Sequence, residues 1–453
     1  MNRVMIAGTA SGSGKTTVTC ALLSMLKDMG KDVISFKCGP DYIDPMFHEK
    51  VTLVPARNLD IFLMGEENVK HVLSYHTQSR DFALIEGVMG LYDGVGSRSY
   101  ASANHLSVIT ETPVILVVNA KGKSQSICAE IKGYLEYEKN NICAVILNNT
   151  SGAMYTFYKD MIESQLHVKV AGFLPSISDI HIKSRHLGLI TANEISDIQD
   201  KMKLLAERAK ECVDLDMIME IAQQAGLIEE KKGALSGIES SKSVKIYVAE
   251  DEAFCFRYED NHEILRKLGA DICYFSPLRD SELPDDADGL ILWGGYPELH
   301  AKELECNEKV KSSIRQKIKN GMPVYAECGG FMYLQEKLTD SQGEVYDMLG
   351  ILEGRTEMRS QLQKFGYVDL TANCDNWLCK KGEKIKAHSF RYSVSSHEGN
   401  EFTATKRSNS ASYQCIVATD NIFAGYPHIH FLGNESMAEN FIQACQNYST
   451  TCN

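Results

Sequence analysis

Residues 3–30, RVMIAGTASGSGKTTVTCALLSMLKDMG, hold a short apolar run, a glycine-rich loop and a segment with apolar residues at helical spacing. The run at residues 3–7 predicts a buried strand, and the segment after Lys15 predicts a helix that ends at Gly30. A glycine-rich loop between a strand and a helix is typical of a P-loop, in which backbone N–H groups and the helix dipole hold phosphate groups. This part of the chain is therefore expected to bind a nucleotide.

The predicted loop is a variant of the usual P-loop pattern, because the spacing from Gly8 to Gly14 is one residue longer. Lys15 is expected to reach the β- and γ-phosphates of ATP, and the Thr16 hydroxyl is expected to ligate Mg²⁺. The alternative, a glycine turn without a ligand, is disfavoured because the strand, the loop, the Lys-Thr pair and the helix coincide. The expected ATP-binding residues are Gly12, Gly14, Lys15, Thr16 and Thr17.

Acidic side chains follow two further apolar runs and are candidates for the same metal site. Asp41 and Asp44 lie in the segment GPDYIDP, and Glu86 ends an apolar run. The carboxyl ends of parallel strands face the ligand in this kind of sheet. Asp41 and Asp44 have an alternative role as turn formers beside proline. Glu86 is harder to explain in that way, since a buried carboxylate needs a partner, and Mg²⁺ held by Thr16 and Glu86 would supply one.

Apolar runs alternate with helix-like segments along most of the chain, which predicts an α/β fold with parallel sheets and helices on both faces. In the first half the runs are residues 33–36, 82–85, 114–118 and 144–147. A charge-rich helical pattern at residues 195–232 ends in the polar stretch GALSGIESSKS, which is typical of a linker. A second series follows at residues 244–249, 289–293 and 323–326. We therefore expect two α/β domains, residues 1–240 and 241–453.

The composition is that of a globular protein large enough for two cores, with 453 residues of which 44% are hydrophobic. A net charge of −13 argues against nucleic acid binding, which requires a basic surface. No apolar stretch approaches the roughly 20 residues that span a bilayer, and the N-terminus lacks a secretory apolar segment. A cytoplasmic location without membrane attachment is expected. The 14 cysteines form no Cys-x-x-Cys pair that would suggest zinc.

Residues 322–334, MPVYAECGGFMYL, predict a strand, a sharp turn at Cys328 and a helix. This geometry projects a nucleophile, and the start of the following helix would favour the reactive thiolate. Upstream, the segment LWGGYPE at residues 292–298 ends another apolar run and could present a backbone N–H group to a developing oxyanion. Gly295 and Gly329 are the expected oxyanion contacts.

A catalytic cysteine needs a positioned proton acceptor, and the segment AGYPHIHF at residues 424–431 offers two histidines. His428 is the expected base for Cys328. Histidine is also common as a half-buried structural residue, and the Cys-Gly-Gly turn is what favours a catalytic role here. From these residues alone, the choice between His428 and His430 stays open.

Together these segments resemble the cobyrinate a,c-diamide synthase family, glutamine-dependent amidotransferases of corrin biosynthesis. The resemblance runs over nearly the whole chain. It implies a dethiobiotin-synthetase-like P-loop domain followed by a class I glutamine amidotransferase domain with a flavodoxin-like α/β fold. Besides the P-loop, the matching segments are residues 36–48, 57–60, 86–94, 185–189, 251–256, 275–278, 294–299, 327–330 and 428–431.

The resemblance implies that the a and c acetate side chains of cobyrinate are amidated, with ATP and L-glutamine as co-substrates. Each carboxylate would first be phosphorylated, and ammonia released from glutamine at Cys328 would then displace the phosphate. Lys15 would contact the γ-phosphate, and Lys37 and Asp44 would lie at the phosphate or the substrate carboxylate. The implied Mg²⁺ ligands are Thr16, Asp41 and Glu86, and the implied glutamine contacts are Gly295 and Gly329.

Two positions depart from the family pattern. Class I amidotransferases read His-Pro-Glu where this chain has His428-Ile-His430, so the third carboxylate of the triad is expected to be absent. His430 or another group would then have to fix the tautomer of His428. The segment KAHSFRYS, residues 386–393, also differs from the family's Gly-His-Glu-Phe-His-Tyr-Ser, so a substrate contact is expected to differ there. An internal ammonia path would require a sizeable domain interface and leaves room for a homodimer.

Other functions remain compatible with the sequence. The same chemistry could act on hydrogenobyrinate or on Ni-sirohydrochlorin, and the high cysteine count favours an anaerobic host and hence cobyrinate. A different class of function is a P-loop ATPase switch of the partitioning type with a degenerate amidotransferase domain. Its ATP turnover would ignore glutamine and tetrapyrrole. The Cys328 turn with its candidate base argues against that alternative.

Overall fold

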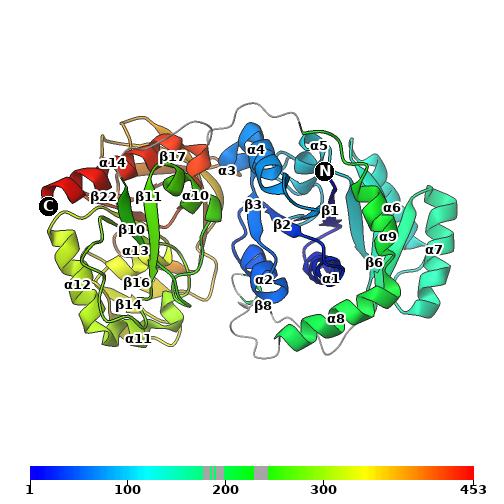
Figure 1. Ribbon diagram of the computed structural model, residues 1–453, viewed down its shortest axis with the longest axis horizontal. Helices are drawn as coiled ribbons and strands as arrows, with labels where there is room; N and C mark the ends of the chain where they lie inside the picture. The colour runs from blue at the N-terminus through cyan, green and yellow to red at the C-terminus, as the bar shows by residue number, and fades with distance from the viewer. Residues whose placement is uncertain (177–183, 186–187, 190–197, 229–242, 453) are drawn as a thin grey trace. The chain divides into compact units, whose positions relative to one another are not determined.

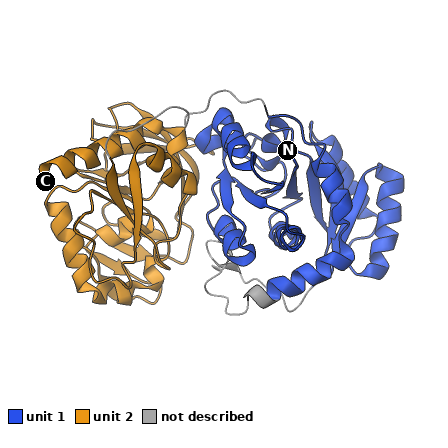
Figure 2. Ribbon diagram, in the orientation of Figure 1, with its two compact units in different colours: residues 1–233 blue, residues 234–453 orange. Residues whose placement is uncertain are grey.

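The computed structural model describes residues 1–176, 184–185, 188–189, 198–228 and 243–452. The chain divides into two compact units, residues 1–233 and 234–453 (Figure 2). The predicted linker and the predicted boundary near residue 240 lie outside the described residues, as does part of the segment 185–189. Each unit has its own sheet and its own core.

Unit 1 is built on a seven-stranded parallel sheet with the strand order β3-β2-β4-β1-β5-β6-β7 (Figure 1). The strands are β1 (Arg3–Gly8), β2 (Val33–Cys38), β3 (Ala56–Leu59), β4 (Phe82–Glu86), β5 (Val114–Asn119), β6 (Ile142–Asn148) and β7 (Lys169–Leu174). Strands β1, β2 and β4 are buried along their whole length, as expected where helices cover both faces of a parallel sheet. The predicted parallel α/β sheet is confirmed.

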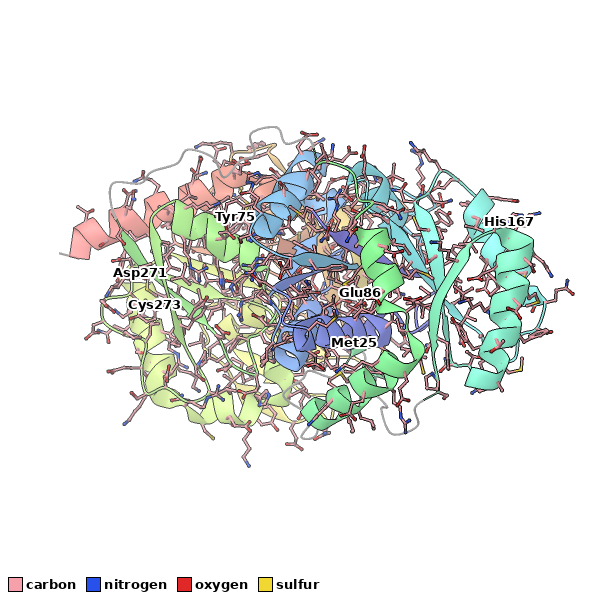
Figure 3. The ribbon with its side chains drawn as sticks, turned by 45° about the vertical axis from the view of Figure 1, so that its right-hand side comes forward. Met25, Tyr75, Glu86, His167, Asp271 and Cys273 are labelled. Atoms are coloured by element: carbon pink, nitrogen blue, oxygen red, sulfur yellow. The ribbon has the colours of Figure 1, made fainter. Side chains whose placement is uncertain are left out.

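The helices of unit 1 are α1 (Lys15–Asp28), α2 (Ile43–Thr52), α3 (Ile61–Met64), α4 (Glu66–Thr77), α5 (Ala103–Ile109), α6 (Ser126–Glu136), α7 (Gly152–Leu166), α8 (Ile198–Cys212) and α9 (Leu215–Ala222). Residues of α1, α2, α8 and α9 share one hydrophobic core with strands β1, β5 and β6. Met25, labelled in Figure 3, lies on the buried side of α1. Helix α1 ends just before Gly30, which has a φ of 73° and donates its N–H group to Lys27 O. A short hairpin, β8 (Ser184–Arg185) and β9 (Gly188–Leu189), lies outside the main sheet.

Unit 2 contains a six-stranded sheet with the order β11-β10-β12-β13-β23-β22. The strands are β10 (Val244–Ala249), β11 (Ala270–Phe275), β12 (Gly289–Leu292), β13 (Val324–Glu327), β22 (Val417–Ala418) and β23 (Ile422–Gly425). All neighbours pair in parallel except β22, an antiparallel edge strand. The first five strands follow the order 2-1-3-4-5, which is the flavodoxin-like order. The predicted fold class of this half is therefore confirmed.

Two smaller antiparallel and mixed sheets complete unit 2. The first contains β14 (Lys337–Thr339), β15 (Val345–Asp347), β16 (Arg355–Met358) and β19 (Ser393–Ser395). The second contains β17 (Lys364–Ala372), β18 (Lys384–Arg391), β20 (Phe402–Lys406), β21 (Ser412–Cys415) and β24 (His428–Ile429). Strand β24 follows β23 closely in the chain but pairs with β18, so it connects the large sheet to this one.

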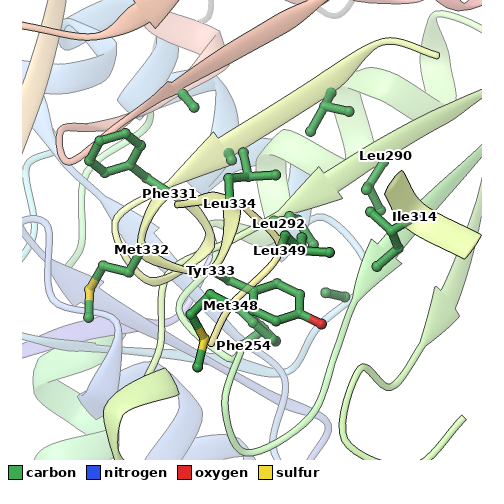
Figure 4. Close-up of a cluster of buried hydrophobic side chains, with 14 of the residues drawn as sticks. Phe254, Leu290, Leu292, Ile314, Phe331, Met332, Tyr333, Leu334, Met348 and Leu349 are labelled. Carbon is green, nitrogen blue, oxygen red and sulfur yellow. The ribbon is translucent and has the colours of Figure 1, made fainter. Parts of the chain in front are cut away.

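The helices of unit 2 are α10 (Glu259–Lys267), η2 (Pro297–Leu299), α11 (Ala301–Cys306), α12 (Glu308–Lys319), α13 (Gly329–Leu334), η3 (Phe431–Gly433) and α14 (Glu435–Cys452). Figure 4 shows Phe331 and Leu334 of α13 in one buried cluster with Leu292 of β12. This core anchors α13 directly after Cys328, so the turn at the cysteine is held from both sides. Among the described residues, no helix combines the length and apolarity needed to cross a membrane.

Candidate active sites

The phosphate loop of unit 1 connects β1 to α1. Gly14 precedes α1 with a φ of 103°, and Gly12 in the exposed part of the loop has a φ of 75°. A Cβ atom on Gly14 would lie 2.0 Å from Nδ2 of Asn148, which donates a hydrogen bond of 2.9 Å to the carbonyl of Ser13. The loop therefore requires glycine at this position both for its backbone angle and for the approach of Asn148.

Lys15 begins α1 and is 7% exposed. Its Nζ donates hydrogen bonds to Ala10 O at 3.0 Å and to Met89 O at 2.6 Å. Burial and, after it, the charge of Lys37 lower the pKa of Lys15 to about 8. Thr17 lies in the same first helical turn and is half-buried. The cationic head of Lys15 thus rests on two carbonyl groups beside the loop that would hold phosphate.

Glu86 contacts side chains from three different elements, helix α1, strand β2 and helix α2. Its Oε1 accepts hydrogen bonds from Thr16 Oγ1 at 2.7 Å and from Lys37 Nζ at 2.8 Å, and its Oε2 lies 2.7 Å from Nε2 of His48. Figure 3 shows Glu86 inside unit 1, where it is fully buried. Burial alone would raise the pKa of Glu86, but the charge of Lys37 and the hydrogen bond from His48 hold it below its usual range. The group is therefore an ionised carboxylate.

Lys37 also forms an ion pair with Asp44. Burial would lower the pKa of Lys37, but the charges of Asp44 and Glu86 raise it above its ordinary value. The structure thus brings together four residues that the sequence assigned to the phosphate and metal site, Thr16, Lys37, Asp44 and Glu86.

Asp41 lies at the start of α2, where its Oδ1 accepts hydrogen bonds from the backbone N–H groups of Ile43 at 2.9 Å and Asp44 at 3.2 Å. This is the turn-forming role that the sequence left open for Asp41. Both of these hydrogen bonds use Oδ1, so this turn leaves the Oδ2 oxygen of Asp41 unused.

His48 is a residue of this site that the sequence did not single out. Its ring is fully buried on α2, with Nδ1 2.8 Å from Ser35 Oγ and Nε2 on Glu86. It occurs at the end of a segment that resembles the family, but nothing local indicates that the ring faces a carboxylate 38 residues away. The sequence also did not indicate a role for Tyr134, whose hydroxyl donates a hydrogen bond to the carbonyl of Thr9 in the phosphate loop.

Cys328 occupies the sharp turn between β13 and α13 in unit 2. Its φ of 48° and ψ of −103° are unusual for a residue with a side chain. The Cys328 N–H group donates to Gly425 O at 2.8 Å, and a Cβ atom on Gly330 would lie 2.0 Å from Leu292 O. The strained turn is thus fixed by the neighbouring strands, which is the geometry expected for a projecting nucleophile.

Three glycines surround the cysteine. A Cβ atom on Gly294 would lie 3.4 Å from the Cβ of Cys328 and 2.7 Å from Cε1 of His428. The Cβ position of Gly329 is 3.0 Å from the backbone nitrogen of Gly295. The predicted oxyanion residues Gly295 and Gly329 therefore lie next to each other beside the nucleophile, and neither of their N–H groups donates to another described backbone group.

His428 lies beside Cys328 and is 2% exposed. Its Nδ1 is 3.1 Å from Oε2 of Glu327, the residue directly before the nucleophile. Burial would lower the pKa of His428, but hydrogen bonds with Cys328 and Glu327 raise it to about 10. The position two residues after the histidine carries no carboxylate, as the sequence indicated. The other group that the sequence left open beside His428 is the carboxylate of Glu327, on the strand that precedes the cysteine.

His430 points to a different part of unit 2. Its Nε2 is 3.8 Å from Oδ2 of Asp260, and its ring centroid lies 4.7 Å from that of Tyr258. Of the two candidate histidines, His428 is the one that contacts Cys328. His388, in the segment that departs from the family pattern, is paired with His428 across β18 and β24.

The geometry defines a protein of two parts, a P-loop unit with a buried lysine–carboxylate cluster and a unit with a Cys-His-Glu site on a flavodoxin-like sheet. Residues 4–189 match the family model of the CobQ/CobB/MinD/ParA nucleotide binding domain, and residues 245–436 match that of the CobB/CobQ-like glutamine amidotransferase domain. The chain belongs to the cobyrinate a,c-diamide synthase family.

Relatives with that name match this chain over nearly their whole length. The chain is 40% identical to the cobyrinate a,c-diamide synthase of Clostridium tetani, covering 96% of this chain and 98% of the relative. It is 38% identical to that of Caldanaerobacter subterraneus, covering 98% of each chain. It is 39% identical to that of Clostridium acetobutylicum, covering 98% of this chain and 100% of the relative.

Proposed function

We propose that this protein is a ligase that amidates the a and c acetate carboxylates of cobyrinate, with ATP and glutamine as co-substrates. The observation that supports it most is that one chain holds chemical groups for both half-reactions, a phosphate loop beside a buried Lys37–Glu86 cluster and a Cys328–His428 pair. The full-length relatives that bear this activity in their names agree with it.

The first half-reaction belongs to unit 1. A carboxylate oxygen of the substrate attacks the γ-phosphorus of ATP, the bond to the β-phosphate oxygen breaks, and ADP leaves an acyl phosphate. Phosphoryl transfer of this kind depends mainly on positioning and on charge neutralisation. Lys15 turns from its carbonyl acceptors to the phosphates, and Lys37 orients the γ-phosphate or the substrate carboxylate beside Asp44.

The side chains around Thr16 fit a divalent cation. The Thr16 hydroxyl and the Glu86 carboxylate offer oxygen atoms 2.7 Å apart, and oxygen is the ligand that Mg²⁺ prefers. Thr16 and Glu86 would hold the ion, and Asp41 is the third ligand that the family resemblance implies. Bound there, Mg²⁺ would neutralise charge on the β- and γ-phosphates. Lys37 would stay on Glu86 or move to the transferred phosphate.

The second half-reaction belongs to unit 2. The Cys328 thiolate attacks the side-chain carboxamide carbon of glutamine, and the N–H groups of Gly295 and Gly329 stabilise the oxyanion. His428 gives its proton to the leaving nitrogen, so ammonia departs and a thioester remains. Water then hydrolyses the thioester to glutamate, with His428 as the base. Ammonia attacks the carbonyl carbon of the acyl phosphate, and phosphate leaves. Two such cycles give the diamide.

Anaerobic incubation with cobyrinic acid, Mg-ATP and amide-¹⁵N glutamine tests the proposal. We expect a product with two labelled amides from the wild type, and Cys328→Ala should form product only when ammonium is added. Cys306→Ala, which removes an exposed cysteine of the same unit, is the matched control and should behave as the wild type.

Other outcomes separate the alternatives. Glutamate release without a mass gain would reject cobyrinate and direct the same assay to hydrogenobyrinate and Ni-sirohydrochlorin. ATP turnover that responds to neither glutamine nor any tetrapyrrole would indicate the ATPase switch. Retention of label in the presence of excess unlabelled ammonium would support internal transfer of ammonia, and loss of label would reject it.

A further inference from the structure

We propose that Glu327 is the positioning residue of the glutaminase site, whose carboxylate keeps the His428 ring in the tautomer and orientation that the Cys328 thiolate requires. This inference rests on the proposed glutaminase function of unit 2. Glu327 is 3% exposed, and its Oε2 faces Nδ1 of His428 at 3.1 Å. A carboxylate at Nδ1 leaves Nε2 to exchange the proton with the reacting group.

The carboxylate of Glu327 is itself held in place by two further donors. Its Oε1 accepts hydrogen bonds from Tyr325 Oη at 2.6 Å and from the Ile429 N–H group at 2.9 Å. Ile429 follows His428 directly, so the same carboxylate binds the ring of one residue and the backbone of the next. Tyr325 lies two residues before Glu327 on β13 and therefore shares its face of the strand. Glu327 thus joins β24 to the strand that carries the nucleophile.

The carboxylate lies directly before the nucleophile in the chain. Glu327 is the last residue of β13, and Cys328 departs from the strand with positive φ. The base lies on β24, which belongs to a different sheet. A single peptide bond therefore joins the nucleophile to the group that orients its base, and no carboxylate after His428 is needed.

The other titratable groups that face His428 do not take over this role. His388 lies opposite on β18, and burial and, after it, the charge of His428 lower its pKa to about 3. It is therefore neutral near neutral pH. Cys328 is the reacting group. His430 lies near Asp260 at 3.8 Å.

Two substitutions of Glu327 separate charge from shape in the full-length protein. Glu327→Gln keeps the shape of the side chain but places an amide where the carboxylate faces Nδ1, so the ring would adopt the wrong tautomer. Glu327→Asp keeps the charge but is one methylene shorter. The readouts are glutamate release, the rate at which iodoacetamide alkylates Cys328 near neutral pH, followed by mass on its peptide, and ammonium-dependent amide formation.

We expect Glu327→Gln to lower glutamate release about 100-fold or more, as loss of an orienting carboxylate does in comparable triads, and to slow alkylation of Cys328 about tenfold. Glu327→Asp should keep an alkylation rate within about threefold of the wild type. Both variants should retain ammonium-dependent synthesis, which depends on unit 1. If Glu327 served only to fill space, Cys328 would be alkylated faster in Glu327→Gln than in Glu327→Asp, since glutamine is the closer match in shape.

The inference is overturned if Glu327→Gln alkylates as fast as the wild type, or if Glu327→Asp is as slow as Glu327→Gln. If Glu327→Gln misfolds and also loses ammonium-dependent synthesis, the alkylation rates of Glu327→Asp and Tyr325→Phe test the positioning role instead. Tyr325→Phe removes one donor to the carboxylate but keeps its charge, so slow alkylation by Glu327→Asp alongside normal alkylation by Tyr325→Phe would reject the role. A wild type without glutamate release would reject the proposed function instead, because the alkylation series does not depend on glutamine.

Discussion

The hydroxyl of Thr16 donates a hydrogen bond of 2.7 Å to Oε1 of Glu86, although 70 positions separate the two residues in the chain. Strands β1 and β4 are neighbours in the sheet, with Ile6 in register with Glu86, and the phosphate loop continues β1 toward the same edge. The contact therefore joins the start of α1 to the carboxyl end of β4. In the proposed function these two oxygens would hold the Mg²⁺ ion.

Thr16→Ala removes one of these oxygens and should lower ammonium-dependent amide formation about 100-fold or more, because electrostatic stabilisation of the transferred phosphoryl group is lost. Glutamate release should be retained, since it belongs to unit 2. Thr19→Val is the matched control, because Thr19 is a buried threonine of the same helix, and its synthesis should stay near the wild-type rate. A Thr16→Ala enzyme with wild-type synthesis would contradict the assignment.

Gly14→Ala should abolish ATP binding. The new Cβ atom would lie 2.0 Å from Nδ2 of Asn148, so either the loop or the amide must move. Gly30→Ala is matched for backbone strain, since Gly30 also has positive φ, at 73°, but a Cβ atom there meets nothing within 4 Å. Gly30→Ala should therefore lose about 1 kcal/mol of stability, the cost of a left-handed backbone for a residue with a Cβ atom, and keep its ATP affinity. Equal ATP affinities in the two variants would show that the Asn148 contact is unimportant.

The affinity for Mg-ATP should depend on the protonation of Lys15. The pKa of Lys15 is lowered to about 8 in the empty loop by burial and by the charge of Lys37. The lysine therefore loses its proton above this pH, and binding of the phosphates must restore it. The dissociation constant should rise up to about tenfold for each pH unit above that value. Titration calorimetry would measure it. Lys15→Arg keeps its charge, so its affinity should be nearly independent of pH in this range, and an identical slope in both proteins would refute the role of Lys15.

The stability of unit 2 should fall with rising pH because of His428. Its pKa is raised from 6.5 to about 10 in the folded protein, so the folded state binds the proton more tightly than the unfolded state. The stabilisation is fully present below pH 6.5 and is lost as the pH rises to about 10. The urea midpoint of the wild type should therefore decrease more over this range than that of His428→Gln.

Tryptophan fluorescence can follow this transition, because both tryptophans of the chain, Trp293 and Trp377, lie in unit 2. Cys328→Ala should reduce the pH dependence in part, since the cysteine is one of the two groups that raise the pKa of His428. Parallel curves for the wild type and His428→Gln would mean that the histidine does not hold an additional proton in the folded state.

Much of the architecture is encoded in short contiguous segments. The strand, loop and helix around Lys15 and the strand and turn around Cys328 have local signals, because glycine placement and apolar periodicity act over a few residues. The parallel sheets follow from the alternation of apolar runs and helices. Thr16 and Glu86 were also assigned to one site from the sequence, since both were expected at the carboxyl edge of one sheet.

Contacts between segments far apart in the chain could not be predicted from the sequence in the same way. His48 meets Glu86 because β2 and β4 are adjacent, and no local pattern encodes that order. No local pattern distinguishes Glu327 from an ordinary strand residue, and the family pattern places the orienting carboxylate two residues after His428, where this chain has His430. The contact of Glu327 with His428 depends on β24, which belongs to a different sheet from β13 but places His428 beside the end of β13. Local geometry is therefore specified by neighbouring residues. A buried charge requires a partner, and that partner is specified by the packing of strands that lie far apart in the chain.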